Sequence, residues 1–477
     1  MLKTLLKRTL LLLLVFGVVW LCVLIWWHET NRIPSSSDVM LYLAGLPSAL
    51  VATYVVLQST LGSIYKALAA PAAQASTDPS PEPEAQPPVA PDAQFKVRLL
   101  HASMRCALGN TAHTVVEALA GGRRAGVDPL LRDPRDFPVY AARVGTLDAG
   151  RITDLRAALV AFDSSITWND ENVRTLALLD DVMMEAYQAV DTHAESHPNA
   201  VRHLPPRLHL VTLIPTHWNG STRDTVERWL HTQSKLRKSG SPGSNIVMAS
   251  SAPHTAFIEV DRIITALNHD DSADFHIIAA AQSDLDTRLI ADYDANGAMF
   301  TGARQHAAIL GEAATALVLR SITKPVTDGN ATAPSPPDAQ VHLARASFGQ
   351  LSLPIDSDSK PEPKTLGLIA ENTLAAASVK GEQIRVLYAD AGSHATRNGE
   401  LSQFAFQHFP TLIQPRECAP LDGGCGITGA AGALLTIALA GHHVKHTQTA
   451  ALAATLADSQ ERAALIAVPG TQVFNET

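Results

Sequence analysis

A glycine-rich stretch near the C-terminus restricts the folds open to this chain more than any other feature. Residues 422–432 read DGGCGITGAAG, and the small apolar run 433–440 follows directly. Glycine carries no Cβ, so glycines at this spacing let the backbone come close to another backbone or to a ligand. The small apolar run that follows the glycines predicts a buried helix. Taken alone, the stretch fits tight packing as well as a ligand-binding loop.

The chain is long enough to form a sizeable core. Its 477 residues fit two or three average domains, or one large domain with two halves. Hydrophobic residues make up 46% of the chain and charged residues only 17%. The net charge of -9 disfavours nucleic acid as a partner. The four cysteines show no metal-finger spacing, and Cys22 lies in an apolar run, so no disulfide framework is expected.

The N-terminus carries a candidate membrane span. Residues 10–27 are almost wholly apolar, follow Lys3, Lys7 and Arg8, and end on tryptophans. This length suffices to cross a bilayer, and tryptophans are common at the membrane interface. No small-residue cleavage site precedes His28, which disfavours a signal peptide.

A second, weaker apolar run covers residues 39–57 and contains Gly45 and Pro47, which membrane helices tolerate. The basic N-terminus predicts that the first residues lie in the cytoplasm. With two spans the rest of the chain also lies there, and with one span it lies on the far side. We expect residues 1–68 to form a membrane anchor with two spans at the bacterial inner membrane, with a cytoplasmic body.

A linker follows the anchor. Residues 69–92 are dense in proline, alanine and acidic residues and contain no aromatic residue, which predicts an extended tether over about residues 69–94. Two further proline-rich interruptions, 325–337 and 356–363, are expected as surface loops that divide the body without making separate domains.

Strands and helices are predicted to alternate in the body, which is typical of an α/β fold with a buried sheet. Asp224 is expected to be the N-cap of the helix that is predicted at residues 224–236. Predicted strands cover residues 96–100, 208–214, 245–248, 275–281, 311–319 and 384–389, and predicted helices cover residues 112–120, 224–236 and 256–268.

Five blocks of the body, in chain order, resemble landmarks of the β-ketoacyl synthases of the thiolase-like superfamily. Residues 108–124, LGNTAHTVVEALAGGRR, are similar to the opening helix of those enzymes. Residues 249–261, followed by residues 275–283, resemble the nucleophile helix and the strand after it. Residues 311–319, GEAATALVL, resemble their GEGAAALVL. Residues 388–400 and 423–432 fall where the family carries NAHGTSTPLND and NIGHTLGAAG.

The resemblance implies a particular α/β fold, a thiolase-like αβαβα five-layer core of two duplicated halves that usually pairs as a dimer. It places the thiolase-like domain at residues 95–477, with halves at roughly 95–325 and 340–470.

The residues that carry ketosynthase chemistry are predicted to be lost. A ketosynthase needs a cysteine thiolate and two histidines. The resemblance places Ser251 at or near the cysteine position, and Gly392 and Gly426 at the histidine positions. No cysteine occurs between Cys106 and Cys418, and a serine without a base is a much weaker nucleophile. We therefore predict a retained fold with no catalytic residues and no cofactor.

Some alternatives for an active site stay open. The nearest candidates are Ser251, His394 and Cys425, the last as a reactive thiol. Ser250 or Ser251 could also form a Ser-His-Asp set with His394 and Asp390, although no GxSxG sequence frames either serine.

Two other polar sets are predicted to be structural. His442 and His446 lie on one helix face in an HHxxH cluster, but Lys445 interrupts it and no glutamate accompanies it, so no metal is expected. Asp284 and Asp286 follow a predicted strand and are expected to be ordinary loop carboxylates.

The overall layout suggests a function by a second resemblance. A membrane hairpin, a proline-rich tether and a divergent thiolase-like body together resemble the adaptor proteins encoded beside type VI secretion phospholipase effectors. This implies a non-catalytic adaptor or chaperone that helps to load a lipase-type toxin onto the VgrG spike. Two alternatives remain: an atypical acyltransferase or thioesterase-like enzyme acting on acyl thioesters, and a membrane-tethered scaffold of another partner.

Overall fold

The structure is a computed structural model. It describes residues 91–196, 206–235, 241–250, 252–270, 274–305, 307–322, 340–355, 363–392, 395–413 and 416–470. They all belong to one compact unit, Pro87–Thr477. The predicted anchor, residues 1–68, and most of the predicted linker lie outside the described residues, so both stay predictions. None of the described helices is both long and apolar enough to span a bilayer.

The first half of the body is a mixed sheet in the order β5-β4-β6-β7-β1. Strands β4, β5 and β6 are parallel, and β7 runs antiparallel to both β6 and β1. Its strands are β1 (Lys96–Cys106), β4 (Arg207–Ile214), β5 (Ser241–Ala249), β6 (Phe275–Ser283) and β7 (Leu310–Arg320).

The second half repeats this arrangement in the order β11-β10-β12-β13-β8. If the five strands of each half are numbered in chain order, both halves show the same order across the sheet, 3-2-4-5-1. Strand β8 pairs with β1, so that the two halves form one continuous sheet. The strands of this half are β8 (Val341–Ala344), β10 (Ile384–Asp390), β11 (Cys418–Pro420), β12 (Ala450–Thr455) and β13 (Glu461–Pro469).

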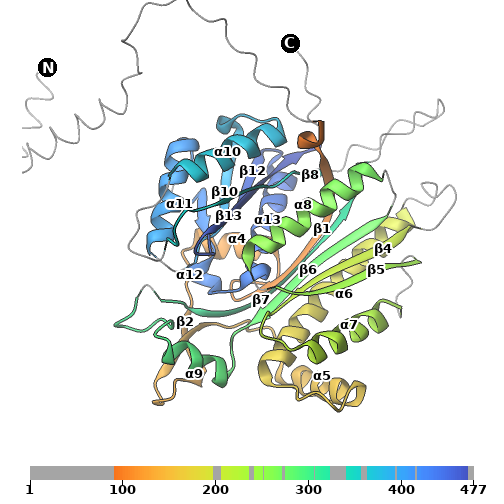
Figure 1. The fold of residues 1–477 in the computed structure, drawn as a ribbon, viewed down its shortest axis with the longest axis vertical. Coiled ribbons are helices and arrows are strands. Elements are labelled where there is room, and N and C mark those ends of the chain that lie inside the picture. The colour runs from red at the N-terminus through yellow and green to blue at the C-terminus, as the bar shows by residue number, and fades with distance from the viewer. Residues whose placement is uncertain are drawn as a thin grey trace, which may run out of the picture. The chain divides into compact units, whose positions relative to one another are not determined.

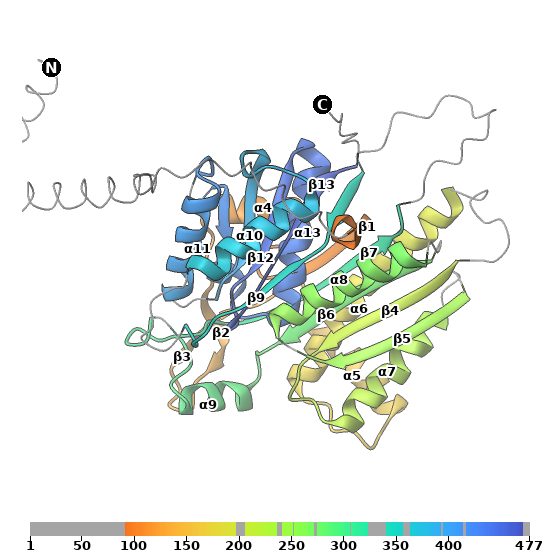
Figure 2. The same cartoon turned by 45° about the horizontal axis from the view of Figure 1, so that its top comes forward.

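Helices cover the strands in layers (Figures 1 and 2). Helices α8 (Pro253–His269) and α13 (Gly429–Thr447) pack together in the middle, and α13 contacts strands of both halves. Helix α6 (Asp170–Ser196) covers β1, β6 and β7 on one outer side, and α10 (Pro363–Ala377) covers β13 on the other. The mixed α/β architecture predicted from the sequence is confirmed.

Smaller helices complete these layers. Among them α4 contacts α13, α5 packs on α6, α7 packs on β5, and α11 packs on α10. Their bounds are α4 (Ala112–Ala120), α5 (Ala149–Phe162), α7 (Gly220–Lys235) and α11 (Ala395–His408).

Helix α13 of the middle layer is buried and consists largely of small residues. Residues 429–441 of α13 are all buried, which confirms the buried helix predicted for the run after the glycines. A Cβ added at Gly441 would lie only 2.4 Å from the Leu99 side chain. A helix that is apolar on every side can pack between two layers of strands, and small residues let those layers come close.

A β-hairpin projects from the first half. Its strands are β2 (Gly126–Arg132) and β3 (Pro138–Ala142), and β3 also pairs with the start of β7. Helix α9 (Thr287–Ala295) packs beside it and shares a small separate core with it. The hairpin and α9 lie at the lower end of the molecule in Figure 1.

One expected helix start was wrong. Helix α7 begins at Gly220, so Asp224 lies within the helix instead of capping it. The side chain of Asn219 accepts the Thr222 N–H at 2.8 Å, and this bond satisfies a free donor of the first turn.

A buried ion pair ties α11 to the second half of the sheet. Arg462 of β13 is 1% exposed, and its Nη2 donates to Oε2 of Glu400 at 2.9 Å. The same guanidinium donates to the carbonyls of Asp458 and Glu461 at 2.7 and 2.8 Å.

Glu400→Ala should lower the free energy of unfolding by about 3–5 kcal/mol, because it leaves the Arg462 charge buried without its partner. Urea unfolding of a fragment starting at residue 87 measures this. Glu117→Ala, which removes an exposed pair with His113, is the control and should change stability by less than about 0.5 kcal/mol. Equal effects of the two variants would contradict the assigned role.

Candidate functional site

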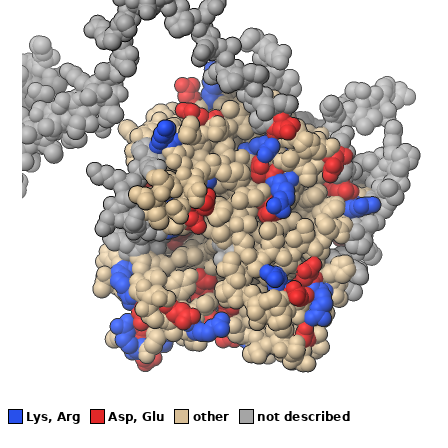
Figure 3. Space-filling view, in the orientation of Figure 1, with Lys and Arg blue, Asp and Glu red and all other residues tan. Residues whose placement is uncertain are grey.

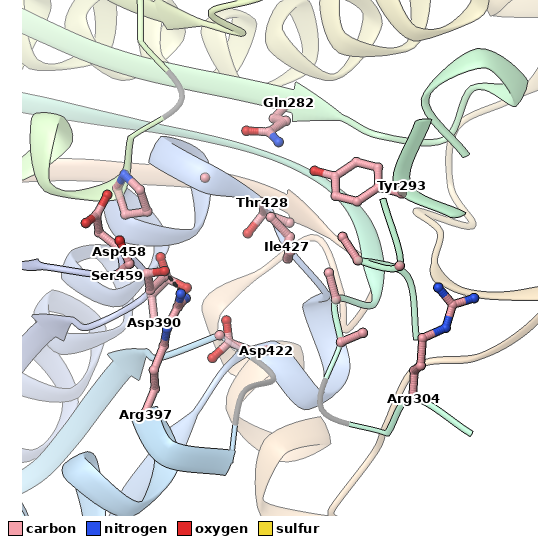
Figure 4. Close-up of a pocket in the computed structure, with 18 of the residues that line it drawn as sticks. Gln282, Tyr293, Arg304, Asp390, Arg397, Asp422, Ile427, Thr428, Asp458 and Ser459 are labelled. Carbon is pink, nitrogen blue, oxygen red and sulfur yellow. Dashed lines mark hydrogen bonds between the residues drawn. The ribbon is translucent and has the colours of Figure 1, made fainter. Parts of the chain in front are cut away.

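A cleft of about 860 Å³ opens at the carboxyl ends of the parallel strands. Ligands commonly bind at this edge of an open α/β sheet. Gln282 at the end of β6 and Tyr293 of α9 form one side, and α13 begins at the floor with Thr428 and Gly429. The opposite side in Figure 4 is formed by Asp390, Arg397, Asp458 and Ser459.

The structure brings some of the predicted site positions to this cleft. Gly392 lines it, and Gly426 directly precedes the lining residue Ile427. Ser251 and His394 lie outside the described residues, although Pro253 at the start of α8 lines the cleft. Where their side chains lie is therefore not described, and their roles stay predictions.

The backbone leaves no room for a side chain at Gly426. Its φ of 65° lies in the left-handed region, and an added Cβ would lie 2.7 Å from the Ile309 carbonyl oxygen and 2.9 Å from that of Leu310. The neighbouring Ile427 N–H donates to the Ile309 oxygen at 2.8 Å, which fixes this approach. A histidine at this position would require the chain to move.

The strand that faces this loop also has no room for a side chain at the contact. A Cβ at Gly311 of β7 would lie 2.2 Å from the Cys425 carbonyl oxygen. Loop and strand therefore pack backbone against backbone, because each carries a glycine at the contact.

An arginine fills the space beside Gly392. This glycine has a φ of 72°, and an added Cβ would lie 2.9 Å from Nη1 of Arg397. The Arg397 guanidinium donates to the Ala457 carbonyl, which ties α11 to the loop after β12. The position that the resemblance assigns to a catalytic histidine therefore adjoins a structural arginine.

Two buried carboxyl groups lie between these glycine positions. Asp390 and Asp422 are 4% and 3% exposed. Burial and the neighbouring Asp422 charge raise the pKa of Asp390 well above its ordinary value. The Asp422 carboxylate accepts the Ala391 N–H at 2.8 Å. The pair thereby joins the end of β10 to the start of α12 (Asp422–Cys425).

A third buried carboxyl group lies behind the opposite wall. Asp284 is 3% exposed, accepts Gln282 Nε2 at 2.9 Å and accepts the Tyr293 hydroxyl at 3.3 Å. Burial raises the pKa of Asp284 to about 6. The expectation of an ordinary loop carboxylate was wrong for Asp284, because the loop folds inward. Asp286 instead caps α9 and accepts the Arg288 N–H at 2.8 Å.

The remaining candidates do not form a reactive centre among the described residues. Cys425 is 1% exposed, and the Cys106 thiol and burial raise the pKa of Cys425 well above its ordinary value, which disfavours the reactive thiolate. The Ser250 hydroxyl donates to Thr255 at 2.8 Å. The rings of His442 and His446 lie 4.3 Å apart, and within the described ranges no group of three or more metal-ligating side chains is arranged to hold a metal ion.

Comparison with known proteins defines the class of fold. No protein-family model and no curated protein matches this chain. A structure of a type II polyketide synthase acyl-carrier protein with its ketosynthase, bound to the hexaketide, matches 79% of this chain and 99% of that chain. The match has 11% identity and a TM-score of 0.51. The body thus has the mixed α/β fold of the thiolase-like ketosynthases.

Two further solved structures are similar at slightly lower scores. A ketosynthase with its chain length factor from Xenorhabdus doucetiae has 15% identity and a TM-score of 0.49, with coverage of 80% of this chain and 99% of that one. A β-ketoacyl synthase from Burkholderia phymatum has 14% identity and a TM-score of 0.49, with coverage of 79% and 99%.

Sequence reasoning missed several polar residues of the cleft, namely Arg397, Asp458 and Tyr293. The sequence analysis did name Asp390 and Asp284, but it did not bring them together at one edge of the sheet. Asp390 and Asp284 each come at or directly after the end of a predicted parallel strand, and such ends gather at one edge of the sheet.

Gly426→Ala should lower the free energy of unfolding by about 2–4 kcal/mol, because the new Cβ is strained at positive φ and meets backbone oxygens. Gly399→Ala is the matched control. Gly399 lies in α11 with open space around its Cα, so alanine should raise stability by about 0.5–1 kcal/mol. Thermal unfolding of both variants measures this, and a neutral Gly426→Ala would refute the close contact.

Asp284→Asn should stabilise the body at pH 8 by about 1–3 kcal/mol and should have little effect near pH 4. The raised pKa of Asp284 means that the folded state binds this proton more tightly than the unfolded state. The stability that Asp284 contributes by binding this proton is therefore present at low pH and is lost as the pH rises through about 6. Urea unfolding across this range measures the difference. Asp286→Asn, which keeps the cap, should show no such pH dependence.

Proposed function

We propose that this chain is a non-catalytic binding protein built on the ketosynthase fold. The observation that carries the proposal is the close backbone contact at Gly426, the position that the resemblance assigns to a catalytic histidine, where an added Cβ would lie 2.7 Å from the Ile309 carbonyl oxygen. Two further observations support it. Arg397 takes the space beside Gly392, and the thiol of Cys425 is buried. These observations support a body that keeps the fold and binds a partner without ketosynthase chemistry.

We further propose that the chain is a membrane-anchored adaptor of type VI secretion, which helps to load a lipase-type toxin onto the VgrG spike. The layout of the sequence supports this: the apolar runs 10–27 and 39–57, then a proline-rich tether, then a divergent thiolase-like body. The anchor would hold the body at the cytoplasmic face of the bacterial inner membrane. A toxin made in the cytoplasm is accessible there before its export.

Among the described strands, β5 ends the sheet order without a further neighbour, and this edge supports pairing as a homodimer. Strand β5 lies at the end of the sheet order, and β4 is its partner on one side. On this strand Ile246 is 45% exposed. An uncovered strand edge readily pairs with a second chain, and two copies of β5 would cover each other.

Co-purification tests the adaptor role. A tagged full-length chain, recovered from inner membranes of its native host in mild detergent, should bring down a phospholipase-type effector together with VgrG. Quantitative mass spectrometry against an untagged strain measures the enrichment. If neither protein is enriched, the adaptor role fails, while the assignment of a non-catalytic fold is unaffected.

The competing function is an enzyme acting on acyl thioesters, which the size of the cleft favours. We expect no covalent acyl adduct after incubation of the full-length chain with radiolabelled acyl-CoA, because the described residues of the cleft include no activated thiolate. An active β-ketoacyl synthase is the positive control. A stoichiometric acyl adduct on Ser251 or Cys425 would overturn the non-catalytic assignment.

A further inference from the structure

Two buried cysteines meet where the first strand of the body ends against the glycine-rich stretch. Cys106 is the last residue of β1, and Cys425 is the last residue of α12. They come from opposite ends of the described chain, yet both belong to one hydrophobic core. Both are free thiols, and they are only 3% and 1% exposed.

Strand β7 places the two cysteines side by side. Cys106 pairs with Ala313 in the register of β1 and β7, so these two side chains lie on the same face of the sheet. The Cys425 carbonyl lies against Gly311, where an added Cβ would be 2.2 Å from its oxygen. Gly311 and Ala313 are two residues apart on one strand and therefore face the same side. Both cysteines thus lie over the same short piece of β7.

Two further contacts bring the thiols together. The Leu108 side chain occupies the space beside Gly424, where an added Cβ would lie 2.6 Å from it, so the segments around the two cysteines also touch. The two thiols form a hydrogen bond with each other. A disulfide requires an S–S distance of about 2.05 Å, and thiols already in hydrogen-bond contact need only a short further approach.

The two thiols differ in their environments. The hydrogen bond with Cys425 lowers the pKa of Cys106, and backbone hydrogen bonds at Leu108 and Gly109 act in the same direction. The same thiol–thiol bond and burial raise the pKa of Cys425. A thiol with a lowered pKa beside a second, protonated thiol is typical of a cysteine pair that reacts with an oxidant.

A small pocket gives access to the pair. Its volume is about 370 Å³, and its lining includes Gly424, which directly precedes Cys425 in the chain. Arg123 also lines it, and the charge of this arginine lowers the pKa of Cys106. The face of the body in Figure 3 mixes acidic and basic side chains, so it gives a charged oxidant no long-range steering. Hydrogen peroxide is small and uncharged, and it needs no such steering.

We propose that Cys106 and Cys425 form a reversible disulfide when the protein meets hydrogen peroxide, and that this bond ties the glycine-rich stretch to the end of β1. Oxidation would then stiffen the floor of the cleft, because the same stretch leads directly into α13. In a reducing cytoplasm the bond is transient, and thiol reductants reverse it. The site does not depend on the proposed adaptor function.

The reaction has two steps and needs one molecule of peroxide. The Cys106 thiolate attacks one peroxide oxygen, the O–O bond breaks, and the leaving hydroxide takes up the proton that Cys106 lost, which gives water and a sulfenic acid on Cys106. The Cys425 sulfur then attacks the Cys106 sulfur. The S–O bond breaks, and the proton of Cys425 leaves with the hydroxide as a second water. The two sulfurs supply the two electrons that reduce the peroxide.

Disulfide mapping tests the bond in the full-length chain, purified in detergent, reduced, and then treated with hydrogen peroxide. Remaining thiols are alkylated in denaturant, and the peptides are analysed by mass spectrometry without reduction. We expect a linked pair that joins Cys106 to Cys425 and is lost with dithiothreitol. Cys418 is the control, because it lies in a different core and its burial raises its pKa to about 12. Full alkylation of Cys106 and Cys425 after peroxide would overturn the proposal, as would links through Cys418.

Trapping with dimedone, which reacts with sulfenic acids, tests the order of the two steps. In Cys425→Ala the sulfenic acid on Cys106 has no partner, so dimedone should label Cys106 after peroxide treatment. In Cys106→Ala, Cys425 should stay unlabelled. Labelling of Cys425 instead of Cys106 would contradict the assigned order.

Thermal unfolding measures whether the bond ties the two segments together. Oxidation should raise the Tm of the unaltered chain by about 3–5 °C. The shift should disappear in Cys106→Ala and persist in the matched control Cys418→Ala. A mapped disulfide without any rise in Tm would refute the stiffening. If either variant at the pair does not fold, disulfide mapping of the unaltered chain decides.

Discussion

The backbone contact between β7 and the glycine loop sets the geometry of the whole body. Gly311 on the strand and Gly426 in the loop bring two main chains closer than any side chain would allow. The loop leads directly into α13, which fills the space between the two halves. The start of the central helix and the floor of the cleft therefore depend on the close approach at these two glycines.

The fold was largely predictable from the sequence, and the failures have physical reasons. The strand at Phe275–Ser283 and the helix at Ala112–Ala120 have clear apolar patterns and are bounded by residues that favour turns or helix caps. Strand β12, AALAAT, was missed because a strand buried on both faces has no alternation, and alanine favours helices. The 27-residue helix α6 was also missed, because its many acidic residues hide the buried stripe.

The candidate site was less predictable, because burial is a tertiary property. Asp284 follows its strand in the sequence as any loop carboxylate would, and its raised pKa comes from residues that surround it only after folding. The loss of histidine at Gly426 was predicted from the resemblance alone. The reason why no side chain fits there, the facing strand, lies more than a hundred residues away. The resemblance therefore predicts a lost histidine at this position, and the structure shows that the backbone around Gly426 leaves no room for a Cβ.

The pairing of β1 with β8 has a mechanical consequence. Four consecutive register pairs, from Lys96 with Ala344 to Leu99 with Val341, join the two sheets edge to edge. Two lobes joined by a flexible linker can open and close around a ligand, but lobes that share a sheet and a central helix cannot hinge without breaking main-chain hydrogen bonds. The body should consequently behave as one stiff block. Any change on partner binding would be confined to the loops at its surface.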